Sequence, residues 1–486
     1  MDSAEPNKIS PQVWRISAVV LIGSVMSILD TTIVNVALAT LSHELHSTIS
    51  EIQWVVTGYM LSLAAVIPVT GWAAKRFGAK QVYLVSLVLF TAGSALCGLA
   101  TSTTELIVFR VLQGVGGGMI LPIGQLMMAE AAGPERMGRV MSIVAVPAML
   151  APILGPTIGG VIIQNTSWRW IFYVNVPIGV IAVATALRYL PWLKPGQTDR
   201  LDVRGLILMA TGLPLLTYGL AEIGVTGGFS SPKVIVPIIA GILLVAAFVL
   251  HALKVPNPLL DVRLYRRATF SSAAFAMFCL GAALFGGMIL LPLYWQEVRL
   301  ESVVHTGLLT APQGLGAACA MPIAGKLTDR WGGGGLALFG VTVCTIATVP
   351  FGLIGAHTSI VWLSFAMFVR GIGIGFGFLP AMAAAFASLK RSELPSATPQ
   401  LNVIQRVGGS IGTAVLAVVL QRALVGAHGP SAAAHAYGTA FWFSAGLTAV
   451  AIIPCVILLR AETKARAAKG RDADASSDTM AEAIAA

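Results

Sequence analysis

The sequence predicts an all-α polytopic membrane protein with fourteen transmembrane helices, and three observations carry this prediction. The chain has 486 residues, of which 56% are hydrophobic and only 11% charged, whereas a soluble domain carries about 25% charged residues. Its apolar residues form repeated runs of about 20, the length that a helix needs to cross the hydrocarbon core. Short basic clusters separate these runs, as expected for loops between membrane spans.

The runs define the predicted elements in chain order. Spans seven and eight are the least regular, because Pro214, Gly227, Gly228 and Pro232 interrupt the apolar pattern there, and two spans are still predicted. The fourteen predicted spans cover residues 14–41, 52–74, 80–100, 104–128, 139–163, 170–190, 203–221, 233–253, 270–296, 303–324, 335–355, 360–388, 399–424 and 440–459.

The distribution of basic residues predicts the orientation, since Lys and Arg are enriched in cytoplasmic loops. With a cytoplasmic N-terminus, the outer loops hold only Arg169, Lys233, Arg299 and Arg422. The basic residues that lie inside predicted spans are Arg110, Arg370 and Arg406. All other basic residues fall on inner segments, and a wrong number of spans would destroy this alternation. Both termini are therefore predicted to be cytoplasmic, in a multi-pass protein of the cytoplasmic (inner) cell membrane.

An internal repeat divides the chain into halves. The sequence GWAAKRFG at 71–78 follows span two, and GKLTDRWG at 325–332 follows span ten. Arg110 in span four has a counterpart in Arg370 of span twelve. The repeat predicts two six-helix bundles related to each other, with a site at their interface. The predicted parts are an N-terminal bundle at 1–190, two inserted central helices with cytoplasmic linkers at 191–269, a C-terminal bundle at 270–459 and a disordered cytoplasmic tail at 460–486.

Seven motifs occur in order along the spans. They are LDTTIVNVAL (29–38), QWVVTGY (53–59), the two loop sequences, RVLQG (110–114), GPTIGG (155–160) and WRW (168–170). Together they resemble the major facilitator superfamily, specifically its fourteen-span drug:proton antiporters of the EmrB/QacA type. The resemblance covers essentially all spans and implies the major facilitator fold.

The resemblance implies gating roles for the two loop motifs and the span-five motif. These candidate gating residues are Gly71, Lys75, Arg76, Gly78, Gly325, Asp329, Arg330, Gly332, Gly155 and Pro156. The chain departs from the family pattern in three places. Lys75 stands where the family usually has Asp, which puts a charge latch at the first loop in doubt. Gly332 is followed by three glycines in place of basic residues, and Ala151 stands where the span-five motif has a glycine.

Asp30 is the clearest acid well inside a span, so it is the predicted proton carrier. Burial disfavours the charged form of a carboxyl group, whereas a nearby cation favours it. The resemblance places spans one and four side by side around the cavity, so Arg110 is expected to tune Asp30. A fixed ion pair that never titrates is the alternative. Glu222, at the end of span seven, is a second proton candidate or an ordinary interfacial acid.

The substrate cavity is predicted less sharply. An apolar cavity with few polar groups suits hydrophobic, cationic or amphipathic drugs. The candidate lining residues are Met26, Trp54, Tyr59, Gln113, Gln313, Phe378 and Arg406. Ordinary helix packing is the alternative for each of them, and for Met26 in particular.

The resemblance implies a secondary active transporter and not an enzyme. The expected activity is drug:H⁺ antiport of hydrophobic or cationic compounds across the cytoplasmic membrane by alternating access. The alternative is a dedicated proton-coupled exporter of one metabolite, antibiotic or siderophore. The chain has no G-x-x-x-x-G-K-[ST] sequence, so the proton gradient is the expected energy source. Sodium coupling stays open.

We expect no cofactor and no metal, since the five cysteines lie in apolar runs without metal-ligand spacing. The net charge of +10 is spread over short loop clusters, so no nucleic-acid partner is expected. The expected partners are membrane lipid, small-molecule drugs and protons. A periplasmic adaptor protein stays open for a Gram-negative host, and we expect a functional monomer.

Overall fold

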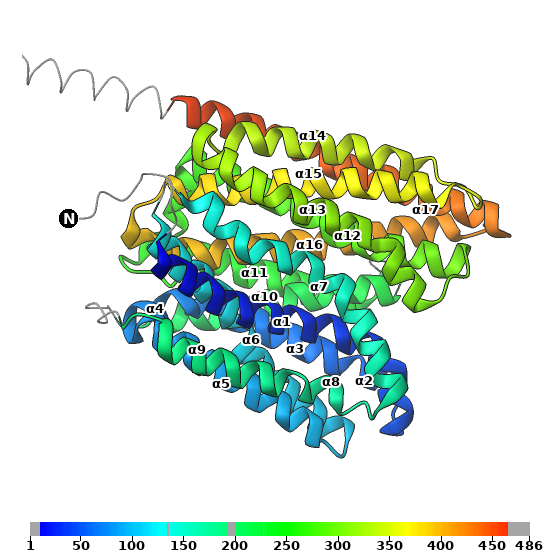
Figure 1. Cartoon of the computed structure of the whole chain (residues 1–486), viewed down its shortest axis with the longest axis horizontal. Helices are drawn as coiled ribbons and strands as arrows, with labels where there is room; N and C mark the ends of the chain where they lie inside the picture. The colour runs from blue at the N-terminus through cyan, green and yellow to red at the C-terminus, as the bar shows by residue number, and fades with distance from the viewer. Residues whose placement is uncertain (1–9, 134–135, 193–199, 227, 229, 465–486) are drawn as a thin grey trace, which may run out of the picture.

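The computed structural model describes residues 10–133, 136–192, 200–226, 228 and 230–464, and these residues form helices and no strand (Figure 1). In chain order the elements are α1 (Pro11–Glu44), α2 (Ile49–Ile52), α3 (Trp54–Val66), η1 (Ile67–Val69), α4 (Thr70–Phe77), α5 (Ala79–Leu99), α6 (Thr103–Ala132), α7 (Met137–Asn165), α8 (Trp170–Tyr173), α9 (Asn175–Tyr189), α10 (Val203–Thr226), α11 (Pro232–Lys254), η3 (Val262–Arg266), α12 (Ala268–Leu293), η4 (Tyr294–Val298), α13 (Val303–Trp331), α14 (Gly333–Gly352), α15 (Ile360–Ala387), η5 (Arg391–Glu393), α16 (Leu394–Leu424) and α17 (Pro430–Val450).

Twelve helical segments of the described chain are long and apolar enough to cross a membrane. The prediction of a polytopic all-helical protein is therefore confirmed, and twelve of the fourteen predicted spans are recovered by length and composition. The other two correspond to α7 and α13, which are 29 residues long each. Some α7 side chains lie outside the described set, and α13 is less apolar because it carries Thr306, Thr310 and Gln313.

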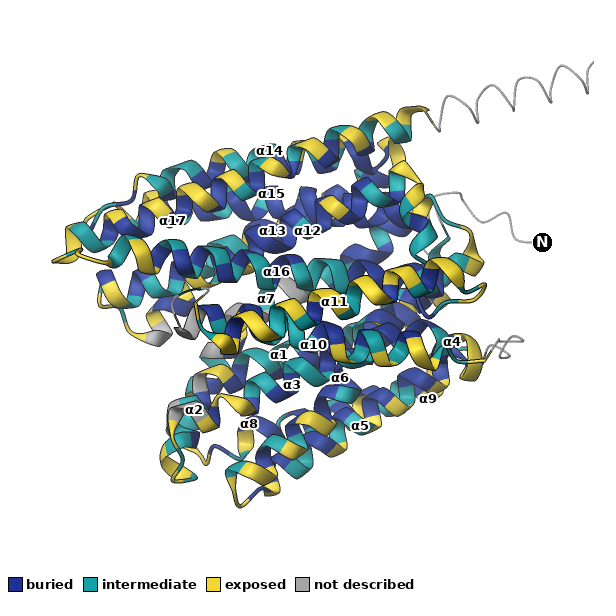
Figure 2. Cartoon of the chain, turned by 180° about the vertical axis from the view of Figure 1, so that it is seen from behind, coloured by how far each residue is buried: buried dark blue, intermediate teal, exposed yellow. Residues whose placement is uncertain are grey.

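Most helices pack in two groups that lie side by side (Figure 1). The N-terminal group comprises α1 to α9, and the C-terminal group comprises α12 to α17. They touch where α7 packs against α13 and where α16 packs against α4 and α6. Helices α10 and α11 pack on each other, and α10 contacts both α3 and α16, so this pair lies across the boundary between the groups (Figure 2).

The second predicted span contains a break. Residues 54–77 form α3, the 3-10 turn η1 and α4 in succession. Pro68 causes the change, because a proline has no N–H to donate to the preceding turn and its ring clashes with that turn's carbonyl. The break redirects α4, which carries the first loop motif toward α16.

Glycines set the position of α6 between α3 and α5. A Cβ atom on Gly116 would lie 2.5 Å from the Phe90 amide nitrogen of α5. A Cβ on Gly114 would lie 2.6 Å from the Tyr59 carbonyl oxygen, and one on Gly118 would meet Leu63. At these three positions the backbone of α6 lies so close to α3 and α5 that a side chain would not fit. The glycine cluster in the fourth span therefore serves close helix packing.

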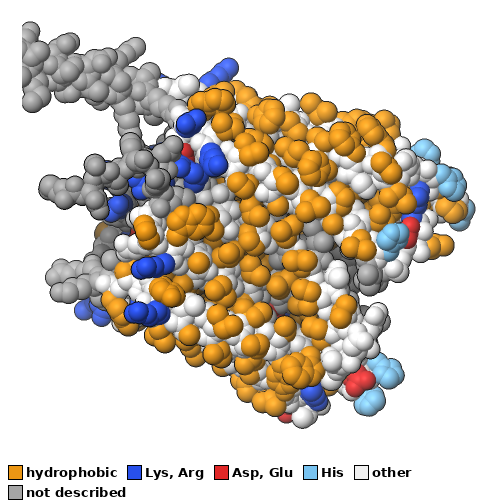
Figure 3. All heavy atoms as spheres, viewed as in Figure 1, with side chains coloured by type: hydrophobic (Ala, Val, Ile, Leu, Met, Phe, Trp, Pro, Cys, Tyr) orange, Lys and Arg blue, Asp and Glu red, His pale blue; other side chains and the backbone are white. Residues whose placement is uncertain are grey.

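The surface is that of a multi-pass membrane protein. Helix α11 exposes Val236, Leu243 and Leu250, which repeat every seven residues along one face. Apolar side chains cover the middle of the face shown in Figure 3, whereas Lys and Arg gather at one end. We call this end, where α1 begins and α6 and α13 finish, the basic end.

The chain stays helical beyond the predicted tail boundary at residue 460. Helix follows α17 to Lys464. Glu462 accepts hydrogen bonds from the backbone amides of Gly333 and Gly334, at 3.1 and 2.7 Å, and so caps the start of α14. The boundary at 460 was therefore wrong, and the remainder of the predicted tail, 465–486, lies outside the described residues.

The glycine packing gives a stability test. We expect Gly116→Ala to destabilise the protein by about 1–3 kcal/mol, the usual cost of forcing an extra group into a packed interface. Gly446→Ala is the matched control, because no heavy atom lies within 4 Å of a Cβ at Gly446 in α17. Thermal unfolding in detergent should show a lower Tm only for Gly116→Ala; equal Tm values would contradict the packing argument.

Candidate functional site

A buried ion pair lies in the N-terminal group. Asp30 of α1 and Arg110 of α6 are both 0% exposed, and Arg110 Nη1 donates to Asp30 Oδ2 at 2.6 Å. The other carboxylate oxygen, Oδ1, accepts from Gln113 Nε2 at 2.9 Å and from Asn175 Nδ2 at 2.8 Å. Asp30 thus has three donors from two further helices, which offsets part of the cost of removing its charge from water.

Arg110 has partners on several sides. Its Nε donates to the Val55 carbonyl at 3.2 Å, and its Nη1 also donates to Gln113 Oε1 at 2.8 Å. The guanidinium carbon lies 4.1 Å from the centroid of the Tyr59 ring, a cation–π contact. Nη2 has no hydrogen-bond partner among the described residues. The arginine is therefore held in place, with one N–H group left over.

The sequence predicted Asp30 and Arg110 as the proton site and Gln113 and Tyr59 as substrate-cavity lining, and the structure brings all four together around the ion pair. The prediction missed Asn175. This residue begins α9 and also donates to Ser94 Oγ at 3.1 Å, which links the site to α5. The available signal was a lone amide within the apolar sequence IFYVNVPIG, because a polar side chain inside a membrane span needs a partner.

Arg370 occupies the matching place in the C-terminal group. It is 0% exposed and donates to Gln313 Oε1 at 2.7 Å, Thr348 Oγ1 at 3.2 Å and the Ala283 carbonyl at 3.2 Å. These acceptors are neutral, so the repeat preserves the arginine and its glutamine partner but replaces the carboxylate. Gln313 therefore holds Arg370.

Four other candidate residues lie apart from the ion pair. Met26 and Phe378 are buried in the central apolar cluster, where they pack as core side chains. Trp54 is 42% exposed and stacks on Tyr218 of α10, with ring centroids 5.7 Å apart. Glu222 lies one turn beyond Tyr218, close enough to interact with it electrostatically.

Arg406 lies where α16 faces the N-terminal group. One turn before it, Asn402 donates to Gln125 of α6 at 2.8 Å, a contact between the two groups. Arg406 is half-buried and close enough to Tyr59 for an electrostatic interaction. Tyr59 is thus near both Arg406 and the Arg110 guanidinium.

The two loop motifs lie at contacts between the helix groups near the basic end. A Cβ on Gly71 of α4 would clash with the Pro395 carbonyl of α16. In the second motif, a Cβ on Gly325 of α13 would lie 2.6 Å from the Gly138 carbonyl of α7. The backbones of the two groups therefore touch at both loops.

Asp329 of the second motif forms a charged link between the groups. Its Oδ2 accepts from Arg139 Nε at 2.9 Å, and its Oδ1 accepts from the Gly138 amide at 3.0 Å. Arg139 and Gly138 belong to the start of α7, and no sequence pattern pairs them with Asp329. This link and the close backbone contacts join the two helix groups at the basic end.

The remaining candidate gating residues occupy several environments. Gly78 and Gly332 end their motifs with φ of 88° and 91°, which favours glycine at both repeats. The exposed residues are Lys75, Arg76 and Arg330. Gly155 of α7 packs directly against Thr32 of α1. The Pro156 side chain lies outside the described residues.

The structure combines a buried acid in the N-terminal group with close contacts between the two helix groups at the basic end. A buried carboxyl group can bind a proton, and protonation would release Arg110, Gln113 and Asn175 from its charge. Three or more His, Cys, Asp or Glu side chains do not gather into a metal site among the described residues. These features are those of a polytopic membrane protein with a charged interior, the class to which membrane transport proteins belong.

The comparisons with known proteins agree with this class. The sequence profile of the Major Facilitator Superfamily matches residues 20–413, so the chain belongs to this superfamily. The chain is 38% identical over 418 residues to the Multidrug resistance protein B homolog of Mycobacterium tuberculosis, covering 85% of this chain and 77% of that protein. It is 32% identical over 407 residues to the Methylenomycin A resistance protein of Bacillus subtilis, covering 83% and 86%.

Solved structures agree on the fold. The proton:xylose symporter XylE has a TM-score of 0.62 at 14% identity, covering 91% of this chain and 94% of that chain. The human organic anion transporter MFSD10 has a TM-score of 0.64 at 14% identity, covering 92% and 100%. At such identities the likeness establishes the major facilitator fold and nothing about substrates.

The ion pair gives a second test of stability. We expect Asp30→Asn to destabilise the protein by about 3–5 kcal/mol, because it leaves the Arg110 charge buried without its carboxylate. The double variant Asp30→Asn/Arg110→Gln should lose less than the sum of the two single variants. Thermal unfolding of all four proteins checks this, and strictly additive losses would show that the two charges do not depend on each other.

The Asp329 link gives a test of closure. We expect Asp329→Asn to shift the population toward an open basic end by about 10- to 100-fold, since a charge-assisted hydrogen bond contributes about 1.5–3 kcal/mol. Spin labels on Lys75→Cys and Lys326→Cys, in a Cys319→Ser background, would report the distance between the groups. Arg330→Gln, an exposed neighbour, is the control; unchanged distance distributions in Asp329→Asn would contradict a latch.

Proposed function

We propose that the protein is a proton-coupled exporter that exchanges protons for drugs across the cytoplasmic membrane. The observation that carries the proposal is the buried Asp30–Arg110 pair in the interior of a transporter. A carboxyl group in such a place is costly to maintain and is a functional site by default. The relatives of this chain include proteins named for multidrug and methylenomycin A resistance. Their names support a drug as the exported compound.

Asp30 is the proposed proton carrier and Arg110 its tuning cation. When Asp30 is charged, it fixes Arg110 and Gln113 of α6 and Asn175 of α9 against α1. When Asp30 binds a proton, this attraction weakens and the helices can shift. A proton therefore favours one conformation over the other, which is what coupling requires. Glu222 is the second candidate, on the edge between α10 and α3.

Alternating access is the proposed movement. The two helix groups act as six-helix bundles, at 1–190 and 270–459, that rock about the site between them. The Gly71 and Gly325 contacts and the Asp329–Arg139 pair support a state closed at the basic end, with the site reached from the other side. Opening this end would expose the site to the opposite compartment.

The proposed topology has fourteen spans. The lengths of α7 and α13, their packing on each other, and the bridging position of α10 and α11 support it. The basic end then faces the cytoplasm, with both termini on that side, because basic residues concentrate there. We propose that the transporter acts as a monomer in lipid, uses the proton gradient and needs no cofactor.

Drug-triggered proton release tests the proposal. We expect purified wild type in weakly buffered solution to release protons when a panel of hydrophobic compounds of each charge type is added. Asp30→Asn should release none, because no proton occupies the carrier. A pH-sensitive dye measures the release, and Glu222→Gln is the matched control that should behave as wild type.

Other outcomes redirect the proposal. Release from Asp30→Asn but not from Glu222→Gln would move the carrier role to Glu222. If wild type releases protons with a single panel compound, a dedicated exporter of one metabolite, antibiotic or siderophore replaces the multidrug exporter. If no compound of any charge type has an effect, drug:proton antiport is rejected.

A further inference from the structure

The charges deep in the membrane interior do not balance. Well inside the described helices, away from their ends, lie three arginines and a single acid, Asp30. The arginines are Arg110, Arg370 and Arg406. Uncompensated charge in a low-dielectric interior is unfavourable. The excess of positive charge therefore needs an explanation, because the proton site accounts for only one arginine.

Two of the three arginines have their partners in the protein. Arg110 pairs with Asp30, and Arg370 is fully buried with three neutral acceptors. Arg406 differs from both. Within the described part of the chain it has no hydrogen bond and no ion pair, and it is only half-buried. Its guanidinium group is therefore charged, largely desolvated and without a protein partner among the described residues, so it is available to bind a ligand.

The direction that Arg406 faces follows from its neighbours along α16. At 3.6 residues per turn, Asn402, Arg406, Thr413, Ala417 and Leu424 fall within roughly 60° of one another around the helix. Asn402 on this face bonds to Gln125 of the N-terminal group. The same face of α16 thus runs from that contact, past Arg406, toward the end opposite the basic end.

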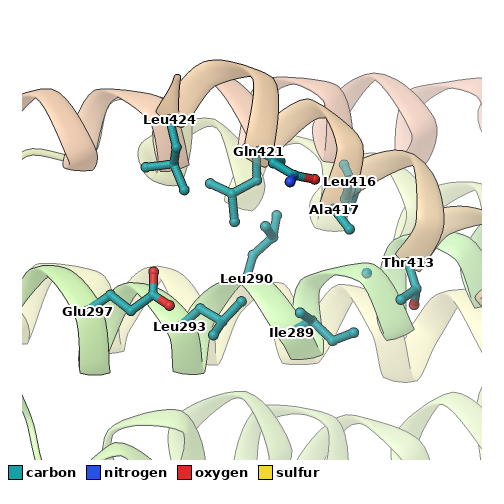
Figure 4. Close-up of a pocket in the computed structure, with 11 residues that line it drawn as sticks. Ile289, Leu290, Leu293, Glu297, Thr413, Leu416, Ala417, Gln421 and Leu424 are labelled. Atoms are coloured by element: carbon teal, nitrogen blue, oxygen red, sulfur yellow. The ribbon is translucent and has the colours of Figure 1, made fainter. Parts of the chain in front are cut away.

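An apolar cavity of about 230 Å³ opens on this face, between α12 and α16 (Figure 4). Leu290 and Leu293 of α12 point toward α16 in Figure 4. Glu297 lies at the end of the cavity opposite Thr413. The nearest cavity residue to Arg406 on its face is Thr413, about 10 Å along the helix at 1.5 Å per residue. A cation at one end and an apolar cavity at the other fit an amphipathic ligand.

We propose that the substrate is an amphipathic organic anion, whose acid group binds Arg406 and whose apolar part enters the cavity of α12 and α16. The proposal rests on the proposed exporter function and names its substrate class. A carboxylate matches the guanidinium group, which can donate two parallel hydrogen bonds to it. A lipophilic cation finds no free carboxylate here, since Asp30 already has Arg110 and two amides, and Glu297 at the far end of the cavity already accepts a hydrogen bond from the Tyr437 hydroxyl.

The anion and the proton occupy different places. Tyr59 is fully buried, packs its ring on the Arg110 guanidinium and is also near Arg406. Asp30 is itself fully buried and already has three donors, so an acid group at Arg406 does not replace the proton on Asp30. Coupling comes from the different conformations that the two ligands favour, not from direct competition for one carboxylate.

Equilibrium binding to the purified full-length protein tests the proposal with three probes of matched shape, namely 4-(1-pyrenyl)butyrate, 4-(1-pyrenyl)butanol and 4-(1-pyrenyl)butylammonium. Wild type should bind the carboxylate at least about tenfold tighter than the ammonium. Arg406→Gln should weaken carboxylate binding by about 10- to 100-fold and leave alcohol binding unchanged. Arg406→Lys should retain part of the preference, because a point charge lacks the paired donors.

Arg422→Gln is the matched control, because Arg422 lies on the same helix but is exposed at its far end. Tighter binding of the ammonium, or equal carboxylate binding by wild type and Arg406→Gln, would overturn the proposal. Equal loss of all three probes in Arg406→Gln would show a structural role and would overturn it as well. If wild type binds none of the probes, the proposal of an amphipathic anion is overturned, whereas the exporter function fails only if the wider panel also releases no protons.

Discussion

The structure depends on a carboxylate and a guanidinium group held together where no water competes. In that environment each charge would be prohibitively costly alone, so Asp30 and Arg110 require each other. Gln113, which bonds to both, and Asn175, which donates to Asp30, fix α6 and α9 against α1. The hydrogen bonds of the candidate proton site are therefore the same bonds that hold these helices together. This couples the protonation state of Asp30 to the packing of the bundle.

Helix packing supplies the other requirement, since charged groups can interact only if backbones approach closely. In a bilayer, lipid tails are as apolar as the side chains, so shape complementarity and not hydrophobic burial decides which helices touch. Gly114, Gly116 and Gly118 bring three helices together around Arg110. Near the basic end, Gly71 and Gly325 do the same between the two groups. The same residue type thus serves contacts within one helix group in one place and contacts between the two groups in the other.

The span pattern, the repeat and the core of the site could be predicted from the sequence because each has a local signal. Apolar runs reveal spans, and a charge inside a run is conspicuous, as with Asp30 and Arg110. The pairing of Asp329 with Arg139 could not be predicted, because it depends on how α7 and α13 cross. Asn175 was missed because an isolated amide gives a weak signal. The break at Pro68 was missed because hydropathy is insensitive to a missing N–H group.

The surplus of interior arginines has an electrical consequence. A membrane that is negative inside does about 2.3 kcal/mol of work per elementary charge per 100 mV. An anion leaving the cell and a proton entering it both move with this field, so each exchange would transfer two charges in the same sense. Export driven through Arg406 would then continue on voltage alone when the pH gradient has collapsed, and the transporter would draw directly on the potential that sustains the cell.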